Sequence, residues 1–130
     1  MRIEFTIPGP PVPKARPRVT KSGFAYTPKR TAVYEMAVKL IFNSKYKEQL
    51  HGPVGARIEA YFKIPKADRK VKENDYCTKH LGDSDNIGKA ILDALNGLAY
   101  EDDAQVVELW IEKRYSITPR VEVVLTELEG

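Results

Sequence analysis

Acidic side chains are concentrated in two short stretches of this sequence, with one lysine among them. Residues 83–89 read D-S-D-N-I-G-K and residues 101–104 read E-D-D-A. Carboxylates this close repel one another unless a cation neutralises them, and hard divalent cations bind where carboxylate oxygens converge. A bound Mg²⁺ can activate water and stabilise the leaving oxygen in phosphodiester hydrolysis. The two stretches therefore predict a divalent-metal site that acts on a phosphate group.

The spacing of the first stretch is typical of one face of a helix. Asp85, Lys89 and Asp93 stand at i, i+4 and i+8, opposite an apolar stripe. In that position Lys89 is expected to contact a non-bridging phosphate oxygen. Structural alternatives remain for each residue taken alone: Asp83 or Asp85 as a helix N-cap, Lys89 as the ion-pair partner of Asp85, and Asp102–Asp103 as a solvated turn. A calcium loop is excluded, because Ala94 stands where its final glutamate is required.

Charge is unevenly distributed along the chain. The first 30 residues hold seven basic side chains and one acidic one, whereas residues 81–103 hold six acidic side chains and one lysine. A basic surface attracts polyanions such as nucleic acid. The arm, residues 11–18 (P-V-P-K-A-R-P-R), carries Lys14, Arg16 and Arg18 between prolines, and we expect these three to contact DNA. The alternative is a solvated loop.

Composition limits the class of protein. The chain has 130 residues, of which 42% are hydrophobic and 30% charged, which is typical of one globular domain over residues 1–130. A membrane partner is not expected, since no run approaches the roughly 18 apolar residues of a membrane span. The lone Cys77 rules out an intrachain disulfide, and the N-terminus shows no signal-peptide pattern, so a cytoplasmic location is expected.

The elements that must position these residues follow from hydrophobic periodicity. Alternation predicts strands over 2–7 and 54–64, and further strands over 106–115 and 121–126. Residues 8–19 are rich in proline and are expected to form an extended loop, and residues 65–82 a polar surface loop. Thr27–Pro28 is typical of a helix start, and the helix expected over 28–48 places an apolar face at Val33, Met36, Ala37, Leu40 and Ile41.

A second helix is expected between Asp83 and Gly97, with its apolar stripe at Ile87, Ala90, Ile91, Ala94, Leu95 and Leu98. The resulting order, β-α-β-α-β-β, predicts a two-layer α+β domain with a mixed sheet and two helices on one face. Both acidic stretches flank elements of the core. We therefore expect them to converge at one edge of the sheet.

Residues 82–107, G-D-S-D-N-I-G-K-A-I-L-D-A-L-N-G-L-A-Y-E-D-D-A-Q-V-V, resemble the core of the RusA family of endodeoxyribonucleases, Holliday junction resolvases common in phages and prophages. The shared pattern is D-x-D-N-x-x-K-x-x-x-D-A-L, then a short gap and D-D-x-Q-V. Segments 11–18, 25–32, 112–115 and 119–123 resemble flanking parts of the family. The resemblance thus spans nearly the whole chain.

This resemblance implies a homodimer that binds a four-way DNA junction and cuts two opposed strands in DNA recombination and repair. It implies Mg²⁺ as the cofactor, with Mn²⁺ as a substitute. By match to the family, Asp83, Asp85 and Asp103 are the catalytic metal-binding carboxylates, Asp102 lies beside them, and Lys89 is the essential lysine. Position 82 departs from the pattern, because it is Gly where some members carry a basic residue or proline.

Two alternative functions stay open at this point. One is a structure-selective nuclease that acts on flaps, forks or other branched DNA. The other is a non-catalytic junction-binding protein. The acidic set disfavours the second, since carboxylates repel phosphate in the absence of a metal.

Overall fold

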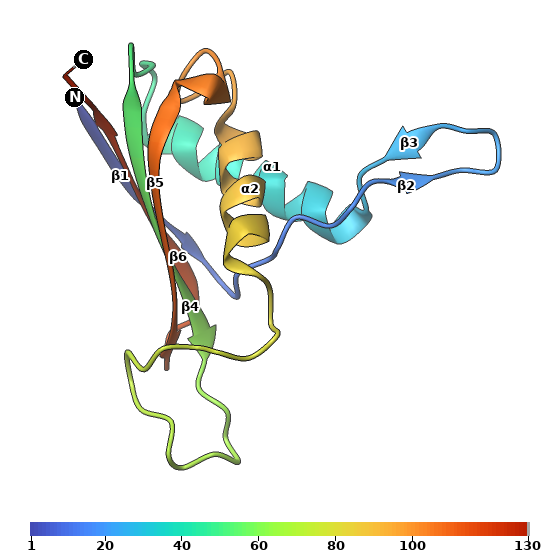
Figure 1. Cartoon of the computed structure of the whole chain (residues 1–130), viewed down its shortest axis with the longest axis vertical. Coiled ribbons are helices and arrows are strands. Elements are labelled where there is room, and N and C mark those ends of the chain that lie inside the picture. The colour runs from blue at the N-terminus through green and yellow to red at the C-terminus, as the bar shows by residue number, and fades with distance from the viewer. Residues whose placement is uncertain (130) are drawn as a thin grey trace.

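Four strands form one mixed sheet, and both long helices pack on the same face of it (Figure 1). The structure is a computed structural model and describes residues 1–129. The strand order is β1-β6-β4-β5, with β4 and β5 parallel and the other two pairings antiparallel. The predicted two-layer α+β fold with a mixed sheet is therefore confirmed. Along the chain the elements are β1 (Arg2–Pro8), β2 (Arg18–Val19), β3 (Ala25–Tyr26), α1 (Lys29–Lys45), β4 (Val54–Lys63), α2 (Ser84–Leu95), the short 3-10 helix η1 (Asp103–Gln105), β5 (Val106–Ser116) and β6 (Arg120–Glu127).

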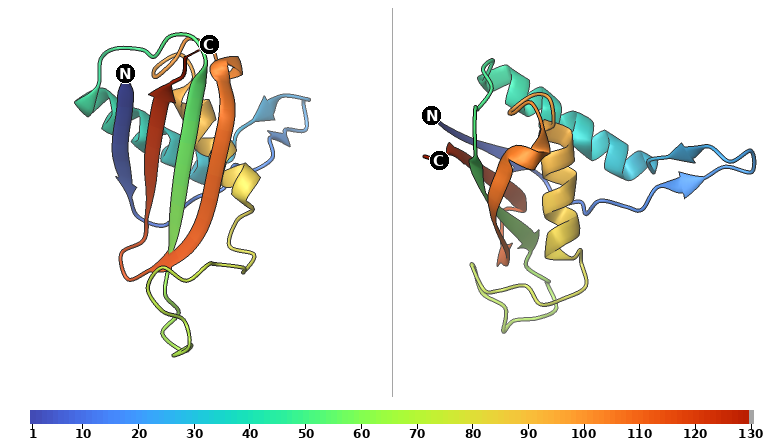
Figure 2. Two further views of the ribbon diagram at one scale, coloured as in Figure 1. Left: turned by 60° about the vertical axis from the view of Figure 1, so that its left-hand side comes forward. Right: turned by 45° about the horizontal axis from the view of Figure 1, so that its top comes forward.

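The alternation of β4 fixes which face of the sheet meets the helices. Its buried side chains include Val54, Ala56, Ile58, Ala60 and Phe62, as the sequence predicts. They join β1 and β6 residues and the inward stripes of both helices in one hydrophobic core. No helix covers the opposite face among residues 1–129, as the left view of Figure 2 shows.

The predicted apolar face of α1 is wrong. Val33, Met36 and Leu40 are 59%, 56% and 63% exposed. The buried side chains of α1 are instead Thr31, Tyr34, Val38 and Phe42. Two stripes of this helix are apolar, and the larger aromatic side chains occupy the one that packs on the sheet. The helix also starts one residue later than expected, with Pro28 at the N-cap position.

The expected extended loop over 8–19 ends in a small hairpin that projects from the body (Figure 1). Arg18 pairs with Tyr26 and Val19 with Ala25 in an antiparallel ladder. Strands of two residues carry no detectable periodicity, so the sequence did not predict them. The loop 65–82 contains no helix or named strand, as expected, and its Cys77 N–H donates to the Lys113 carbonyl on the outer edge of β5 (2.9 Å). None of the helices in the part described could cross a bilayer.

Helix α2 lies close to β5 because a glycine faces that strand. A Cβ built on Gly88 would lie 2.3 Å from Cδ1 of Ile111. Nearer the start of β5, Val107 and Leu109 are 62% and 50% exposed. Ile111, on the same strand, is partly buried and packs against the core. Gly97 ends the helix region with a φ of +81°, the left-handed conformation expected for it.

We predict that Gly88→Ala destabilises the protein by about 1 kcal/mol, because the added methyl overpacks the contact with Ile111. In an unobstructed helix the same change would stabilise by about 1 kcal/mol. Urea unfolding measures the difference. In an Ile111→Val background, which lacks the Cδ1 atom, Gly88→Ala should stabilise instead. A stabilised Gly88→Ala in the parent background would contradict close packing of α2 on β5.

Candidate metal and nucleic-acid site

Two of the predicted metal ligands lie at the N-terminus of α2 with their carboxylates free. Asp83 occupies the N-cap position, but its side chain makes no capping hydrogen bond. Asp85 lies in the first turn, and both side chains are exposed. Within residues 1–129, neither carboxylate takes part in an ion pair or a side-chain hydrogen bond. The N-cap alternative is therefore not realised, and both groups are available to a cation.

The other two predicted ligands lie beyond the C-terminus of α2. Asp102 caps η1: its Oδ1 accepts from the Ala104 N–H (3.0 Å), while the Gln105 side chain accepts from the Asp102 N–H (3.1 Å). Asp103 is fixed through its backbone, whose N–H donates to Oδ1 of Asn96 (3.0 Å). The Asp102 carboxylate thus serves the turn, and the Asp103 carboxylate remains free among the residues described.

Asp103 also lies near a buried tyrosine. The Tyr100 hydroxyl donates to the Leu92 carbonyl (2.7 Å), and burial, followed by the charges of Asp103 and Asp93, raises its pKa. Asp93, in the C-terminal half of α2, and Asp103, in η1, therefore both lie near Tyr100.

The expected convergence of the two acidic stretches does not occur within one chain. Helix α2 has 12 residues, so about 18 Å separates its ends. Asp83 and Asp85 stand at one end, and Asp103 stands beside Asn96 at the other. In the described part of the chain, no group of three or more His, Cys, Asp or Glu side chains is placed to hold a metal ion. The sequence showed both stretches flanking the core but not that a straight helix lies between them.

Lys89 lies on the exposed side of α2 between the two ends. Its ammonium is 3.6 Å from Oδ2 of Asp93, and its side chain is 61% exposed. The i,i+4 ion pair therefore forms with Asp93 and not with Asp85. Because the side chain remains largely exposed, the ammonium can still reach a phosphate oxygen.

Lys14 is the predicted DNA contact whose placement differs most from expectation. Its ammonium binds Oε2 of Glu35 at 2.7 Å and lies 3.3 Å from Oδ2 of Asp93, and its side chain is only 15% exposed. Burial by itself would lower the pKa of Lys14, but the hydrogen bonds to these two carboxylates outweigh it, and the pKa is raised. This placement favours a structural role. No local pattern indicates it, because the partners are 21 and 79 residues away in sequence.

The arginines on the uncovered face of the sheet are neutralised by glutamates. Examples are Arg57–Glu59 (2.9 Å), Arg114–Glu112 (3.0 Å) and Arg120–Glu122 (2.6 Å). The hydrogen bond from Arg114, and then that from Trp110, lowers the pKa of Glu112. Trp110 also lies under the Arg57 guanidinium, 5.3 Å from ring centroid to Cζ. Positive charge on this face is balanced locally, so it attracts a polyanion weakly.

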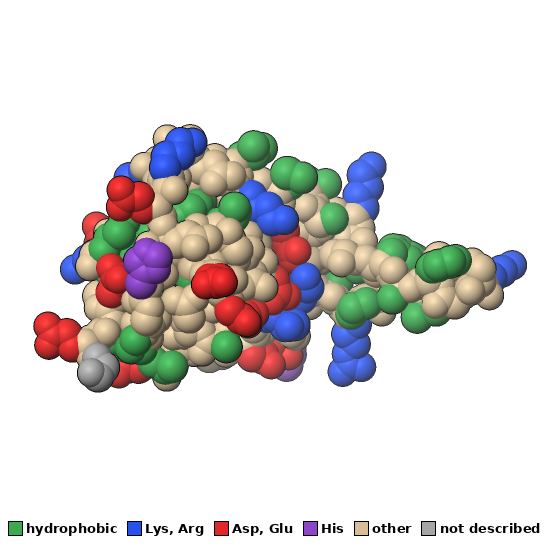
Figure 3. Space-filling model, turned by 90° about the horizontal axis from the view of Figure 1, so that it is seen from above, with side chains coloured by type: hydrophobic (Ala, Val, Ile, Leu, Met, Phe, Trp, Pro, Cys, Tyr) green, Lys and Arg blue, Asp and Glu red, His purple; other side chains and the backbone are tan. Residues whose placement is uncertain are grey.

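Unbalanced positive charge gathers on the arm, the hairpin and the start of α1. Seen from above, the projecting hairpin carries basic and apolar side chains but no acidic ones (Figure 3). Across residues 1–129, none of five cations in this region forms an ion pair: Arg16, Arg18, Lys21, Lys29 and Arg30. The prediction that Arg16 and Arg18 contact DNA is compatible with this surface. Lys29 and Arg30 lie on the same surface but were not among the predicted DNA contacts.

Comparison with known proteins found a family match and a relative that aligns over nearly the whole chain. A family model described as endodeoxyribonuclease RusA matches residues 8–126. The chain is also 35% identical over 139 aligned residues to the uncharacterized protein YqaN of Bacillus subtilis (strain 168), and the alignment covers 98% of each chain. The matched range includes the arm, α2 and both acidic stretches.

We predict that Lys14→Met destabilises the protein by about 2 kcal/mol, because it leaves Glu35 and Asp93 close together without their cation. Lys29→Met, on the exposed start of α1, is the control and should change stability by less than about 0.5 kcal/mol. The raised pKa of Lys14 means that its contribution is complete below pH 10.5 and is lost as the pH rises through the folded-state value. Urea unfolding at pH 7 and pH 11 measures both effects; equal stability of the two variants at pH 7 would disprove the structural role.

Proposed function

Because the chain belongs to the RusA family of endodeoxyribonucleases, we propose that it is a Mg²⁺-dependent nuclease that resolves four-way (Holliday) DNA junctions. Paired cuts in two opposed strands would serve DNA recombination and repair. The observation that carries the proposal is that Asp83 and Asp85 have no ion-pair partner among residues 1–129 and lie at the end of α2 that borders the unpaired Arg18 and Arg30. Free carboxylates weaken simple DNA binding, so they indicate a metal-dependent reaction.

The residues at this end of α2 fit a magnesium ion. Mg²⁺ usually binds through one or two carboxylates and completes its octahedron with water and substrate phosphate oxygens. Asp83 and Asp85 would supply those carboxylates, and Mn²⁺ would substitute. When bound, the metal supplies an activated water and charge stabilisation for the leaving oxygen. Lys89, held near Asp93, would offset negative charge on a non-bridging oxygen of the phosphate.

The position of Asp103 favours a homodimer. If a second copy packs with its α2 antiparallel to this one, its Asp103 lies near Asp83 and Asp85 of the first chain, and the reverse holds by symmetry. The exposed Val107 and Leu109 of β5 lie beside α2 and offer apolar surface for such packing. Two sites related by a two-fold axis also match a substrate in which two opposed strands are cut.

A nuclease that acts on flaps or forks remains the alternative, since it would use the same carboxylates and the same basic arm. A panel of branched DNA substrates separates the two. A non-catalytic junction-binding protein would bind every substrate that the enzyme binds but would cut none.

We predict that the purified protein makes paired, symmetric nicks in a synthetic four-way junction when Mg²⁺ is present. Asp85→Asn should slow cutting by roughly 100-fold or more while junction binding stays equal or tightens, because a metal ligand and a repulsive charge are both removed. Asp68→Asn, the same chemical change in the loop 65–82, is the control. Binding without cutting in Mg²⁺ or Mn²⁺ would refute the enzyme assignment.

Mixing two inactive variants tests the shared site. In a dimer of Asp85→Asn with Asp103→Asn, one of the two composite sites carries both substitutions and the other carries neither. After random exchange of subunits, half of the dimers are mixed and each mixed dimer has one intact site, so about a quarter of all sites should be active. This activity would be detected as single nicks in the junction. Sites contained within one chain would give no recovery, and that result would remove the antiparallel arrangement.

A further inference from the structure

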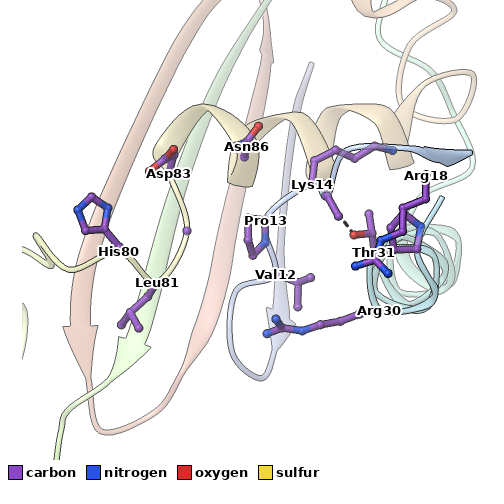
Figure 4. Close-up of a pocket in the computed structure, with 13 residues that line it drawn as sticks. Val12, Pro13, Lys14, Arg18, Arg30, Thr31, His80, Leu81, Asp83 and Asn86 are labelled. Atoms are coloured by element: carbon purple, nitrogen blue, oxygen red, sulfur yellow. Dashed lines mark hydrogen bonds between the residues drawn. The ribbon is translucent and has the colours of Figure 1, made fainter.

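A pocket of about 570 Å³ opens beside Asp83, the residue at the N-cap of α2. It lies between the arm, the start of α1 and the segment that leads into α2 (Figure 4). Asp83 and Asn86 form part of its wall, so the pocket and the candidate metal site share a border. Its volume is within the range of roughly 300–1,000 Å³ that is typical of small-ligand sites.

The walls of the pocket differ in chemistry. In Figure 4, Arg18 and Arg30 stand on one side, His80 and Asp83 on the other, and the apolar Val12 and Pro13 lie between them. In the part of the chain that the structure describes, neither arginine forms an ion pair. Two free guanidinium groups beside an apolar surface are suited to an anion that carries an apolar body.

Hydrogen bonds from the arm to both helices fix the shape of the pocket. The Lys14 N–H donates to the Asn86 carbonyl (2.8 Å), and the Ala15 N–H donates to Oγ1 of Thr31 (3.2 Å). Gly82 has a φ of +144°, and a Cβ at this position would lie 3.2 Å from the ring of Pro13. The glycine thus lets the arm pass close to the segment before α2. A side chain at this position would push that wall outward.

We propose that this pocket binds one nucleotide of the DNA strand next to the scissile phosphodiester. Arg30 and Arg18 contact its phosphate group, and Val12, Pro13 and Leu81 accept its sugar or base. A strand whose reacting phosphate lies at Asp83 and Asp85 must pass this border, because the backbone is continuous. The inference rests on the proposed nuclease function, but the binding it describes requires no catalysis.

The test measures junction affinity in EDTA, so that no strand is cut. Arg30→Ala should weaken binding about tenfold and reduce the salt slope by about one unit. Lys29→Ala is the matched control: it removes the same charge from the neighbouring position of α1, outside the pocket. Arg30→Lys should restore little of the loss, because it keeps the charge but lacks the two-pronged guanidinium.

A junction with single neutral methylphosphonates identifies the contacted phosphate. One methylphosphonate, placed in turn at each position near the crossover, should weaken wild-type binding about tenfold at one position. For Arg30→Ala, this methylphosphonate should cause no further loss of affinity. For Lys29→Ala, it should still weaken binding about tenfold. Arg18→Ala provides a second variant with the same expectation.

The outcomes separate this inference from the proposed function. The inference fails if two results are found together. The first is that Arg30→Ala and Lys29→Ala weaken binding equally. The second is that every methylphosphonate weakens binding by Arg30→Ala and Arg18→Ala as much as it weakens binding by the wild type, which means that the pocket does not hold a nucleotide. That result overturns the inference even if the wild-type protein cuts junctions. A wild-type protein that binds as described but cuts nothing in Mg²⁺ would disprove the nuclease function and leave the pocket in place.

Discussion

The ammonium group of Lys14 holds together the three segments that build the candidate site. It lies between Glu35 of α1 and Asp93 of α2, two carboxylates that would otherwise repel each other across the helix interface. The backbone on either side of this lysine then runs along both helices, which sets one wall of the pocket. Asp93, anchored in this way, is also the partner of Lys89. A single partly buried cation therefore couples the course of the arm to the orientation of Lys89.

Much of the fold could be predicted because strand alternation is a local signal. Each second side chain of β4 points to the core, and this needs no knowledge of the rest of the chain. The face of α1 could not be predicted in the same way. Both of its stripes are apolar, and periodicity alone does not say which one meets the sheet. The stripe with Tyr34 and Phe42 is buried, which leaves Met36 on the surface.

The sequence indicated which carboxylates are exposed at the candidate site, but it did not indicate the distances between them. The grouping of carboxylates pointed to Asp83 and Asp85, which have no ion-pair partner in the part of the chain that the structure describes. The different roles of Asp102 and Asp103 could also be predicted. An aspartate three residues before Gln105 matches a capping box, in which the first side chain accepts a backbone hydrogen bond. The distance between the two acidic stretches could not be predicted from the sequence, because it depends on how an unbroken α2 lies against β5.

Helix α2 acts as a spacer in the proposed dimer. With one site at each end of an antiparallel helix pair, the number of helical residues sets the distance between the two sites. Adding or removing one turn would change that distance by about 5.4 Å. Adding a non-integral number of turns between Asp85 and Lys89 would also rotate the two side chains onto different faces of the helix. The length of this helix would then determine which separation of opposed strands the protein can cut, independently of any residue that touches DNA.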